Sequence, residues 1–247
     1  QFTSGTTGFP KGACLTHRGV INASLYSARA GEFPDGGVWV NAMPMFHIGG
    51  CGYGSSTMTV GGHTILLREV NPARIIEVIA KHKVTHTFLV PTVVQAVLEV
   101  PHVNEADLGS MQLLMYGAAP MGDVLLRRAI EVLRCQFMQA YGMTETAGTV
   151  VVLPPEDHEP QGSRSALLSS VGRVLPWVAM RVVNPHGHIH TLVRHYFVFY
   201  FEHLGSIGLC ESAPGPVRAS CFNRCHAVHR RNTFVDHELH QGLSLWV

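Results

Sequence analysis

The chain has 247 residues, of which 46% are hydrophobic, and a formal net charge of +1 at pH 7. This length allows one large domain or two small ones, and the apolar fraction is sufficient for a hydrophobic core. Because the sequence has no basic run and no acidic tail, its charge argues against non-specific binding to nucleic acid or membranes. Small molecules are the expected partners, and the sequence says nothing about oligomeric state.

The cysteines, the apolar runs and the first residues of the sequence indicate where the protein works and whether the chain is whole. The six cysteines are too scattered for a small disulfide framework, so a reducing cytoplasmic location is expected. There is no window of about 18 uninterrupted apolar residues, which argues against a transmembrane segment. The sequence begins inside a motif, with neither an initiator methionine nor a signal peptide, and we therefore expect a piece of a longer protein.

Short apolar runs alternate with amphipathic segments over residues 1–185, a pattern typical of βα units on a mainly parallel sheet. The expected class is therefore α/β, with helices flanking the sheet. The predicted elements in chain order are a helix at 17–31, a strand at 37–43, a Gly/Ser/Thr-rich helix at 49–62, a strand at 63–68, a helix at 71–84, a strand at 85–90, a helix at 91–100, a strand at 111–117, a helix at 122–134 and a strand at 136–142.

Local signals mark the ends of these helices. Thr16 is the expected N-cap of the first helix and Gly31 its expected end. Asn71 is a predicted N-cap followed by Pro72, which suits a first helical position because its missing N–H costs nothing there. Asp123 lies near the start of the helix at 122–134. Glycine-rich and polar loops follow the strands, at the carboxyl edge where open α/β sheets build ligand sites.

Residues 1–12 combine the groups that a triphosphate needs. Backbone N–H groups at Gly5 and Gly8 can point at an anion without obstruction by a Cβ atom, and Lys11 adds a positive charge. The hydroxyl donors are Thr3, Ser4, Thr6 and Thr7. The lysine precedes a glycine, whereas the Walker spacing places it before Ser or Thr, so a P-loop NTPase is disfavoured. The alternative interpretation is a flexible Ser/Thr/Gly linker.

Five ordered motifs together resemble one known family. The segment TSGTTGFPKG resembles the phosphate loop of the adenylate-forming (AMP-binding) superfamily, and later segments resemble its subsequent motifs in the same order. These are TSGTTGFPKG at 3–12, PMFHIGG at 44–50, YGAAPMG at 116–122, YGMTET at 141–146 and VGRVLPW at 171–177. The Met-Phe-His and Gly-Ala-Ala-Pro forms look most like bacterial-type medium- or long-chain fatty-acyl-CoA synthetases. The match covers about residues 1–185, which corresponds to an incomplete large N-terminal domain of that family.

The resemblance implies a two-step reaction and its cofactors. A carboxylic acid, expected to be a fatty acid, reacts with ATP and Mg²⁺ to give an acyl-adenylate and pyrophosphate, and the thiol of coenzyme A then attacks the adenylate. The phosphate loop from Thr3 to Lys11 would hold the β- and γ-phosphates, since charge that develops there needs fixed donors. In this family resemblance, Thr144 corresponds to an α-phosphate contact and Glu145 to the magnesium ligand, a hard carboxylate for a hard cation.

The same resemblance assigns the remaining candidate residues. Tyr141 would lie beside the adenine, Gly142 would belong to the nucleotide-binding residues, Met143 would border the acyl pocket, and His47 would position or gate the carboxylate. Gly117, Ala118 and Ala119 would form a wall of small residues. Each residue also has a plainer interpretation: Tyr141 and Met143 as core residues, Glu145 as a solvated carboxylate and His47 as a structural residue. Arg173 is interpreted as pinning a loop, and the helix at 49–62 as leaving a groove for an acyl chain or simply packing closely.

The sequence departs from the family pattern after residue 185. Residues 186–247 contain nine of the sixteen histidines and no lysine, and neither a Gly-Glu pair nor a Thr-Gly-Asp triplet occurs there. The ribose-binding aspartate and the adenylation lysine of the family are therefore missing, and we expect this chain to be partial or inactive. The composition shift indicates a divergent tail of different origin. The alternative is a non-catalytic nucleotide- or acyl-binding module with a partner- or metal-binding tail.

One segment of the tail could bind a metal. Cys221, Cys225, His226 and His229 offer thiolate and imidazole ligands of the kind that zinc prefers. Their tight spacing is unlike that of a two-knuckle zinc site, and the adjacent Cys225 and His226 would have difficulty reaching one tetrahedral centre. The strand propensity of residues 195–201 predicts a β-strand that would favour aggregation if it were exposed.

Overall fold

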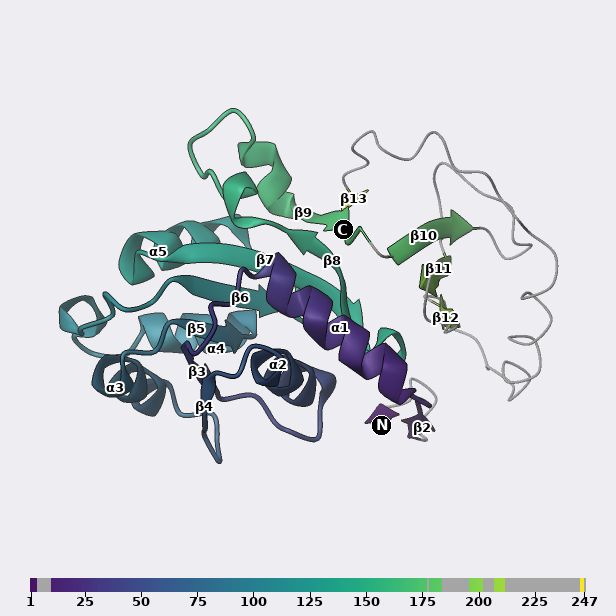
Figure 1. The fold of residues 1–247 in the computed structure, drawn as a ribbon. Helices are drawn as coiled ribbons and strands as arrows, with labels where there is room; N and C mark the ends of the chain where they lie inside the picture. The colour runs from purple at the N-terminus through teal and green to yellow at the C-terminus, as the bar shows by residue number, and fades with distance from the viewer. Residues whose placement is uncertain (4–9, 177, 184–195, 202–206, 212–244, 247) are drawn as a thin grey trace.

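A computed structural model of the chain describes residues 1–3, 10–176, 178–183, 196–201, 207–211 and 245–246. Its centre is an eight-stranded sheet with the strand order β13-β9-β8-β7-β6-β5-β3-β4 (Figure 1). The strands are β3 (Val38–Asn41), β4 (His63–Leu66), β5 (His86–Leu89), β6 (Leu113–Gly117), β7 (Gln136–Met143), β8 (Gly148–Leu153), β9 (Ser170–Val174) and β13 (Leu245–Trp246).

The sheet is parallel on one side and antiparallel on the other. Strands β4, β3, β5, β6 and β7 run parallel, whereas β8 returns antiparallel to β7 and β9 antiparallel to β8. All residues of β5 and β6 are buried, as expected for strands covered on both faces. The predicted α/β class with a mainly parallel sheet is confirmed.

Helices cover the two faces of the sheet in separate groups. Helices α1 and α2 lie side by side and contact β8, while α3, α4 and α5 follow one another on the opposite face (Figure 1). This division follows from right-handed crossovers, because the chain moves from β3 to β4 in one direction and then from β4 through β7 in the other. The helices are α1 (His17–Ala30), α2 (Ile48–Met58), α3 (Pro72–His82), α4 (Pro91–Leu98) and α5 (Asp123–Leu133).

The helix ends agree with the predicted caps. The Thr16 hydroxyl accepts a hydrogen bond from the Gly19 N–H at 3.0 Å, and Gly31 ends the helix. The Asn71 side-chain carbonyl accepts from the Arg74 N–H at 3.0 Å, with Pro72 at the first helical position. Helix α2 ends at Met58, four residues before the predicted end. Short 3₁₀ segments were not predicted: η1 (Val103–Glu105), η2 (Thr144–Thr146), η3 (Pro155–Asp157) and η4 (Ser165–Ser169).

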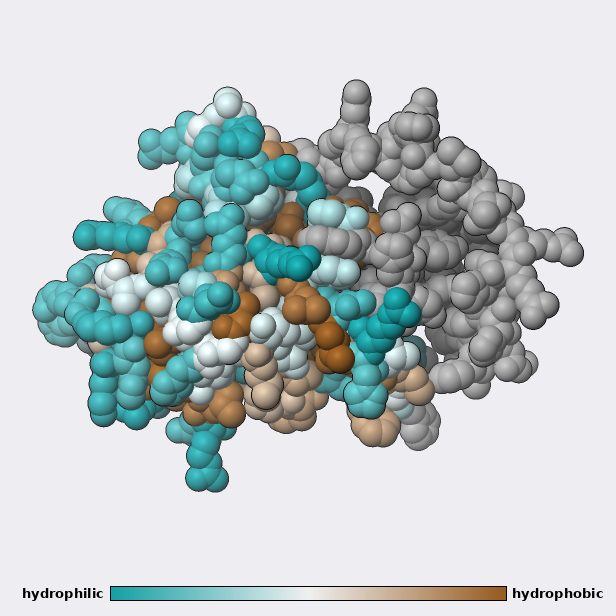
Figure 2. Space-filling model, viewed as in Figure 1, coloured by the Kyte–Doolittle hydropathy of each residue, from teal (hydrophilic) through white to brown (hydrophobic). Residues whose placement is uncertain are grey.

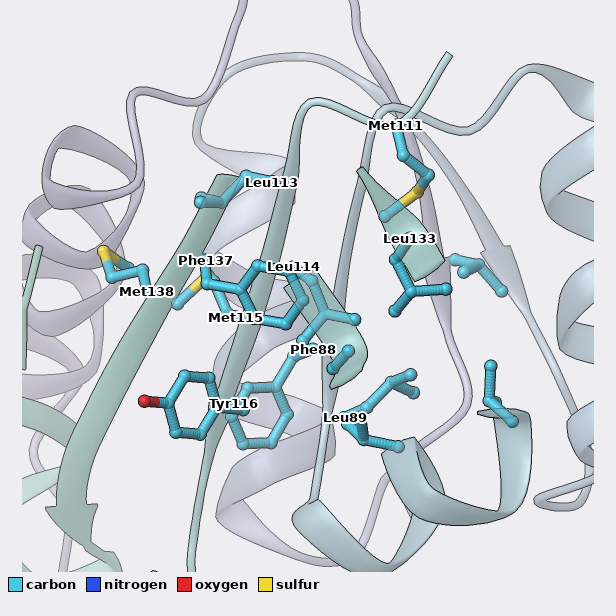
Figure 3. Close-up of a cluster of buried hydrophobic side chains, with 14 of the residues drawn as sticks. Phe88, Leu89, Met111, Leu113, Leu114, Met115, Tyr116, Leu133, Phe137 and Met138 are labelled. Carbon is cyan, nitrogen blue, oxygen red and sulfur yellow. The ribbon is translucent and has the colours of Figure 1, made fainter. Parts of the chain in front are cut away.

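The core lies between the parallel strands and their helices. Figure 3 shows side chains from β5, β6 and β7 packed together, including Phe88, Leu114 and Phe137. The Tyr116 ring belongs to this cluster, and its hydroxyl is directed away from the Phe88 ring. The outer surface over α1 and α2 is mixed: hydrophilic residues dominate it, with hydrophobic side chains between them (Figure 2). Ile21, Leu25 and Met58 are among the exposed apolar residues of these two helices.

A second sheet follows the main one, with the strand order β10-β11-β12. The predicted strand at 195–201 is present as β11 (Tyr196–Phe201), in the middle between β10 (Val178–Val183) and β12 (Ile207–Glu211). Both neighbours pair with it in antiparallel register, so its backbone is not a free edge. The proposed zinc ligands Cys221, Cys225, His226 and His229 lie outside the described residues.

Candidate functional site

The predicted site segments follow three parallel strands at one edge of the sheet. Residues 44–50 come after β3, residues 117–122 extend from the end of β6, and residues 141–146 span the end of β7 and η2. Strand β3 lies between β4 and β5, where the direction of chain winding reverses. Open α/β sheets bind ligands at the carboxyl ends of their strands near such a reversal, so the topology brings these segments to the expected edge.

A two-stranded ribbon brackets the glycine-rich loop. Strand β1 (Phe2–Thr3) pairs antiparallel with β2 (Lys11–Gly12), and the register places Thr3 opposite Lys11. Lys11 is exposed and makes no ion pair with another described residue. The other predicted phosphate-loop residues, Ser4, Gly5, Thr6, Thr7 and Gly8, lie outside the described residues.

The ribbon is attached to the segment that contains His47. The Gln1 side-chain amide donates to the Phe46 carbonyl at 3.0 Å and to the Cys51 sulfur at 3.3 Å. These hydrogen bonds join the start of the ribbon to the first turn of α2. The structure therefore brings Thr3 and Lys11 into the neighbourhood of the 44–50 segment, although the segments lie far apart in sequence.

His47 is exposed and serves as the N-cap of α2. Its Nδ1 accepts a hydrogen bond from the Gly49 N–H at 3.1 Å. Because Nδ1 acts as the acceptor, the proton of the neutral imidazole lies on Nε2. The structural interpretation of His47 and the positioning role are compatible, since capping leaves Nε2 available as a donor at the carboxyl edge of the sheet.

The aromatic ring of Phe88 lies between the turn that contains His47 and the small residues at the end of β6. A methyl group built on Gly49 would lie 3.2 Å from one ring carbon of Phe88, and one built on Gly117 would lie 3.5 Å from another. The glycines of α2 also allow close packing, because a Cβ atom at Gly50 would lie 2.2 Å from the Pro44 carbonyl oxygen. Close packing thus explains Gly50, and the acyl-groove interpretation of this helix stays a prediction.

A cavity of about 540 Å³ opens beside the β6 and β7 ends. Its walls come from the loop after β6, the end of β7, the start of α5 and the segment from η4 to β9. The lining residues are Gly117, Ala118, Ala119, Pro120, Met121, Gly122, Asp123, Arg127, Gln139, Ala140, Tyr141, Gly142, Ser165, Ala166, Leu168, Ser169 and Val171. Five of the predicted nucleotide-binding residues therefore share one cavity: Gly117, Ala118, Ala119, Tyr141 and Gly142.

The small residues of this cavity are also required by the backbone. A Cβ atom on Gly117 would lie 2.1 Å from the Ala140 carbonyl oxygen, and one on Gly142 would lie 2.0 Å from the Gly148 carbonyl oxygen. Ala118 adopts a positive φ of 65°, which is unusual for a residue with a side chain. Such backbone conformations persist where the surrounding structure enforces them, and they concentrate at functional sites.

Thr144 and Glu145 stand at the far end of β7, within the 3₁₀ turn η2. The turn is fixed by Thr146, whose hydroxyl donates to the Met143 carbonyl at 2.9 Å or the Gly148 carbonyl at 2.7 Å and accepts from the Met143 N–H at 3.1 Å. Glu145 is half-buried and forms no ion pair with another described residue. Its carboxylate is thus available to a cation at the position that the family resemblance assigns to magnesium.

Met143 and Tyr141 pack beside a small apolar cluster that includes Val150, Val151 and Val171. Tyr141 also lines the cavity, whereas Met143 does not. The core interpretation of Met143 has contacts in its favour, and the acyl-pocket role stays a prediction. Sequence reasoning did not identify Thr146 as the residue that fixes the turn, because the contacts of its hydroxyl with Met143 and Gly148 depend on the local fold.

A second group of residues was missed by the sequence reading. Asp157, at the end of η3, is buried and accepts hydrogen bonds from Arg164 at 2.7 Å and from Arg173 at 2.6 Å. Arg173 therefore pins a loop beside the site, as predicted. Next to Asp157, the buried His158 ring contacts the Tyr116 hydroxyl at 3.0 Å. Burial lowers the pKa of His158 and raises the pKa of Tyr116.

Comparison with known proteins identifies the family. The AMP-binding enzyme family matches residues 1–191. The chain belongs to this family. A fatty acid–[acyl-carrier-protein] ligase of Streptomyces coeruleorubidus is 32% identical over 75% of this chain, and a medium/long-chain-fatty-acid–CoA ligase of Mycobacterium tuberculosis is 29% identical over 75%. The matched parts are 36% and 32% of those two proteins, so the chain spans about a third of their length.

A solved structure has the same fold. The O-succinylbenzoate–CoA synthetase of Bacillus subtilis, in complex with ATP and a magnesium ion, superimposes with a TM-score of 0.69 at 26% identity. The superposition covers 80% of this chain and 40% of the synthetase. Together these matches establish a chain of the adenylate-forming type whose relatives include acid–thiol ligases. No helix among the described residues is long and apolar enough to cross a membrane.

Proposed function

We propose that the parent enzyme to which this chain corresponds activates a carboxylic acid, expected to be a fatty acid, with ATP and Mg²⁺ and passes the acyl group to the thiol of coenzyme A, and that the 247-residue chain itself is partial or inactive in this reaction. The observation that carries this proposal is the cavity beside β6 and β7, which joins Gly117, Ala118 and Tyr141 next to the Thr144–Glu145 turn. The charged residues among its described lining are Asp123 and Arg127, which bind each other at 2.8 Å. An apolar cavity with neutral walls of this size suits a purine ring.

Each candidate residue then has a task in the first step. Lys11 and the Thr3 hydroxyl, which are opposed in the ribbon, would bind the departing pyrophosphate. The Thr144 hydroxyl would bind the α-phosphate, and the Glu145 carboxylate would hold Mg²⁺, which would supply positive charge to neutralise the phosphate oxygens. His47 would donate from Nε2 to the substrate carboxylate and hold it for attack on the α-phosphorus. Positioning of this kind accounts for much of the acceleration of group transfer.

The fatty acid, the CoA acceptor and a cytoplasmic location are parts of the proposal. Fatty-acid activation is supported by the two relatives, which are named for fatty acids but differ in their thiol acceptors. The three described cysteines, Cys14, Cys51 and Cys135, are free thiols, which suits a reducing compartment.

Acid-dependent exchange of labelled pyrophosphate into ATP tests the proposal on the 247-residue chain. We expect weak exchange that requires a fatty acid and Mg²⁺ and that Lys11→Ala or Glu145→Ala abolishes, since each variant removes a charge that stabilises the transition state. Lys81→Ala is the matched control, because Lys81 is exposed near the end of α3. Nucleotide binding without exchange would instead favour a non-catalytic binding module.

A further inference from the structure

The cavity that the proposed function assigns to the nucleotide has two walls that are held by one short turn. Turn η3 (Pro155–Asp157) and the following His158 lie outside the five motifs and outside the cavity lining. Their side chains nevertheless reach both walls. Among the described residues, the three side chains that bind Asp157 or His158 each lie within one or two residues of a cavity-lining residue: Arg164, Arg173 and Tyr116.

Asp157 holds the wall formed by η4 and β9. Its side chain is only 5% exposed, and its two carboxylate oxygens accept from different arginines, Arg164 on one side and Arg173 on the other. Arg164 directly precedes the lining residue Ser165, and Arg173 follows Val171 by two residues. Charge-assisted hydrogen bonds to a buried carboxylate fix geometry strongly, because a buried carboxylate that lost its cationic partners would be left without compensation.

His158 holds the wall formed by the loop after β6. Its Nδ1 lies 2.9 Å from the Pro154 carbonyl, which can only accept, so Nδ1 carries the proton. Nε2 is therefore the acceptor, and the Tyr116 hydroxyl donates to it at 3.0 Å. Tyr116 immediately precedes Gly117, and Figure 3 shows its hydroxyl leaving the core cluster on the side away from Phe88.

A third contact ties the same turn to α5. Arg127, which lines the cavity, donates to the carbonyl of Pro160, two residues after His158. The turn and the residues just after it thus connect the β6 loop, the η4 segment and α5.

We propose that Asp157 and His158 act as positioning residues that set the separation of the two cavity walls and thereby the affinity for the adenosine part of the nucleotide. This inference rests on the proposed nucleotide site. It predicts that loosening the turn weakens binding of AMP without weakening binding of an inorganic triphosphate, because Thr3 and Lys11, the described ends of the phosphate loop, make no hydrogen bond to the turn, whose bonds run to the cavity walls.

The test compares Asp157→Asn and Tyr116→Phe with the control Glu159→Gln in the 247-residue chain. Glu159 contacts the same Arg164 at 3.2 Å, but on the exposed side of the turn. Calorimetric titration with AMP should show about tenfold weaker binding in the first two variants, as expected for the loss of one hydrogen bond that fixes a wall. Binding of tripolyphosphate should stay unchanged, and Glu159→Gln should bind both like the wild type.

A purely structural role predicts a different result. Variants that are only less stable would bind fewer equivalents of AMP and of tripolyphosphate alike, with unchanged dissociation constants. Hydrogen exchange of the free chain adds a measurement that needs no ligand: Asp157→Asn should accelerate exchange at 165–169, and Glu159→Gln should not. Wild-type affinities together with unchanged exchange at 165–169 would overturn the wall-positioning role alone. A wild-type chain that binds no AMP would overturn the proposed nucleotide site itself, and the positioning role with it.

Discussion

At the scale of single residues, two glycines of the same cavity differ in what they permit. A Cβ atom on Gly117 would approach the Ala140 carbonyl oxygen to 2.1 Å, whereas one on Gly122 would meet nothing within 4 Å. We therefore expect Gly117→Ala to lower the free energy of unfolding by about 2 kcal/mol or more, since backbone must move. Gly122 is the N-cap of α5, so Gly122→Ala should lower it by less than about 1 kcal/mol, because the poorer cap is partly offset by the lower entropy of the unfolded chain. Urea unfolding of both variants measures this; equal stabilities would contradict the close approach of β6 and β7.

A buried histidine makes the stability depend on pH. His86 is only 2% exposed and packs against Phe33 and Trp39, and burial lowers its pKa to about 4. The unfolded chain binds this proton with its ordinary pKa near 6.5, so stability is full above that pH and is lost as the pH falls towards 4. This one group accounts for a loss of up to about 3 kcal/mol.

Unfolding measured from pH 7 to pH 4 checks the His86 contribution. The variant His86→Phe keeps an aromatic ring among Phe33 and Trp39 and should show a shallower fall in stability. His158 also has a lowered pKa and adds a loss of the same sign, so some dependence should persist in this variant. An unchanged slope in His86→Phe would show that another group controls the acid sensitivity.

At the scale of elements, substitution by glycine should have opposite effects on stability at the end of helix α5 and inside it. Arg134 caps α5 with a φ of 51°, a left-handed conformation that favours glycine. Arg134→Gly should raise the free energy of unfolding by about 0.5–1 kcal/mol. Glu131→Gly, inside the same helix and equally exposed, should lower it by about 1 kcal/mol. Thermal unfolding distinguishes them, and a loss of stability in both variants would contradict the left-handed cap.

The helix ends also show which parts of the fold could be predicted from the sequence. Thr16 and Asn71 were recognisable as caps because a cap depends on residues three positions apart. The left-handed ends at Lys83 and Arg134 were not recognisable, since neither residue is glycine and neither side chain favours that conformation. The Tyr116–His158 hydrogen bond joins residues 42 positions apart, so no local sequence pattern predicts it. Motif order located the cavity residues, whereas the turn that supports them needed the folded chain.

At the scale of the whole molecule, the site depends on contacts that join distant segments. Gln1 links the ribbon of Thr3 and Lys11 to Phe46, and the Phe88 ring separates Gly49 from Gly117. A ligand that spans the phosphate loop and the cavity would therefore bind the folded state only. Binding of this kind stabilises a protein by mass action, by about 2.7 kcal/mol when the ligand concentration is 100 times its dissociation constant.

This linkage gives a test of the magnesium assignment that does not require turnover. We expect ATP with Mg²⁺ to raise the melting temperature of the 247-residue chain by several degrees, and removal of Mg²⁺ with a chelator to reduce the shift. Glu145→Gln should remove the dependence on Mg²⁺ but leave the stabilisation by AMP, because only the metal ligand is lost. Glu131→Gln, on the exposed face of α5, is the charge-matched control. If Glu145→Gln retained the full response to Mg²⁺, the metal would have to bind elsewhere, and the role of the η2 turn would be reduced to supporting the end of β7.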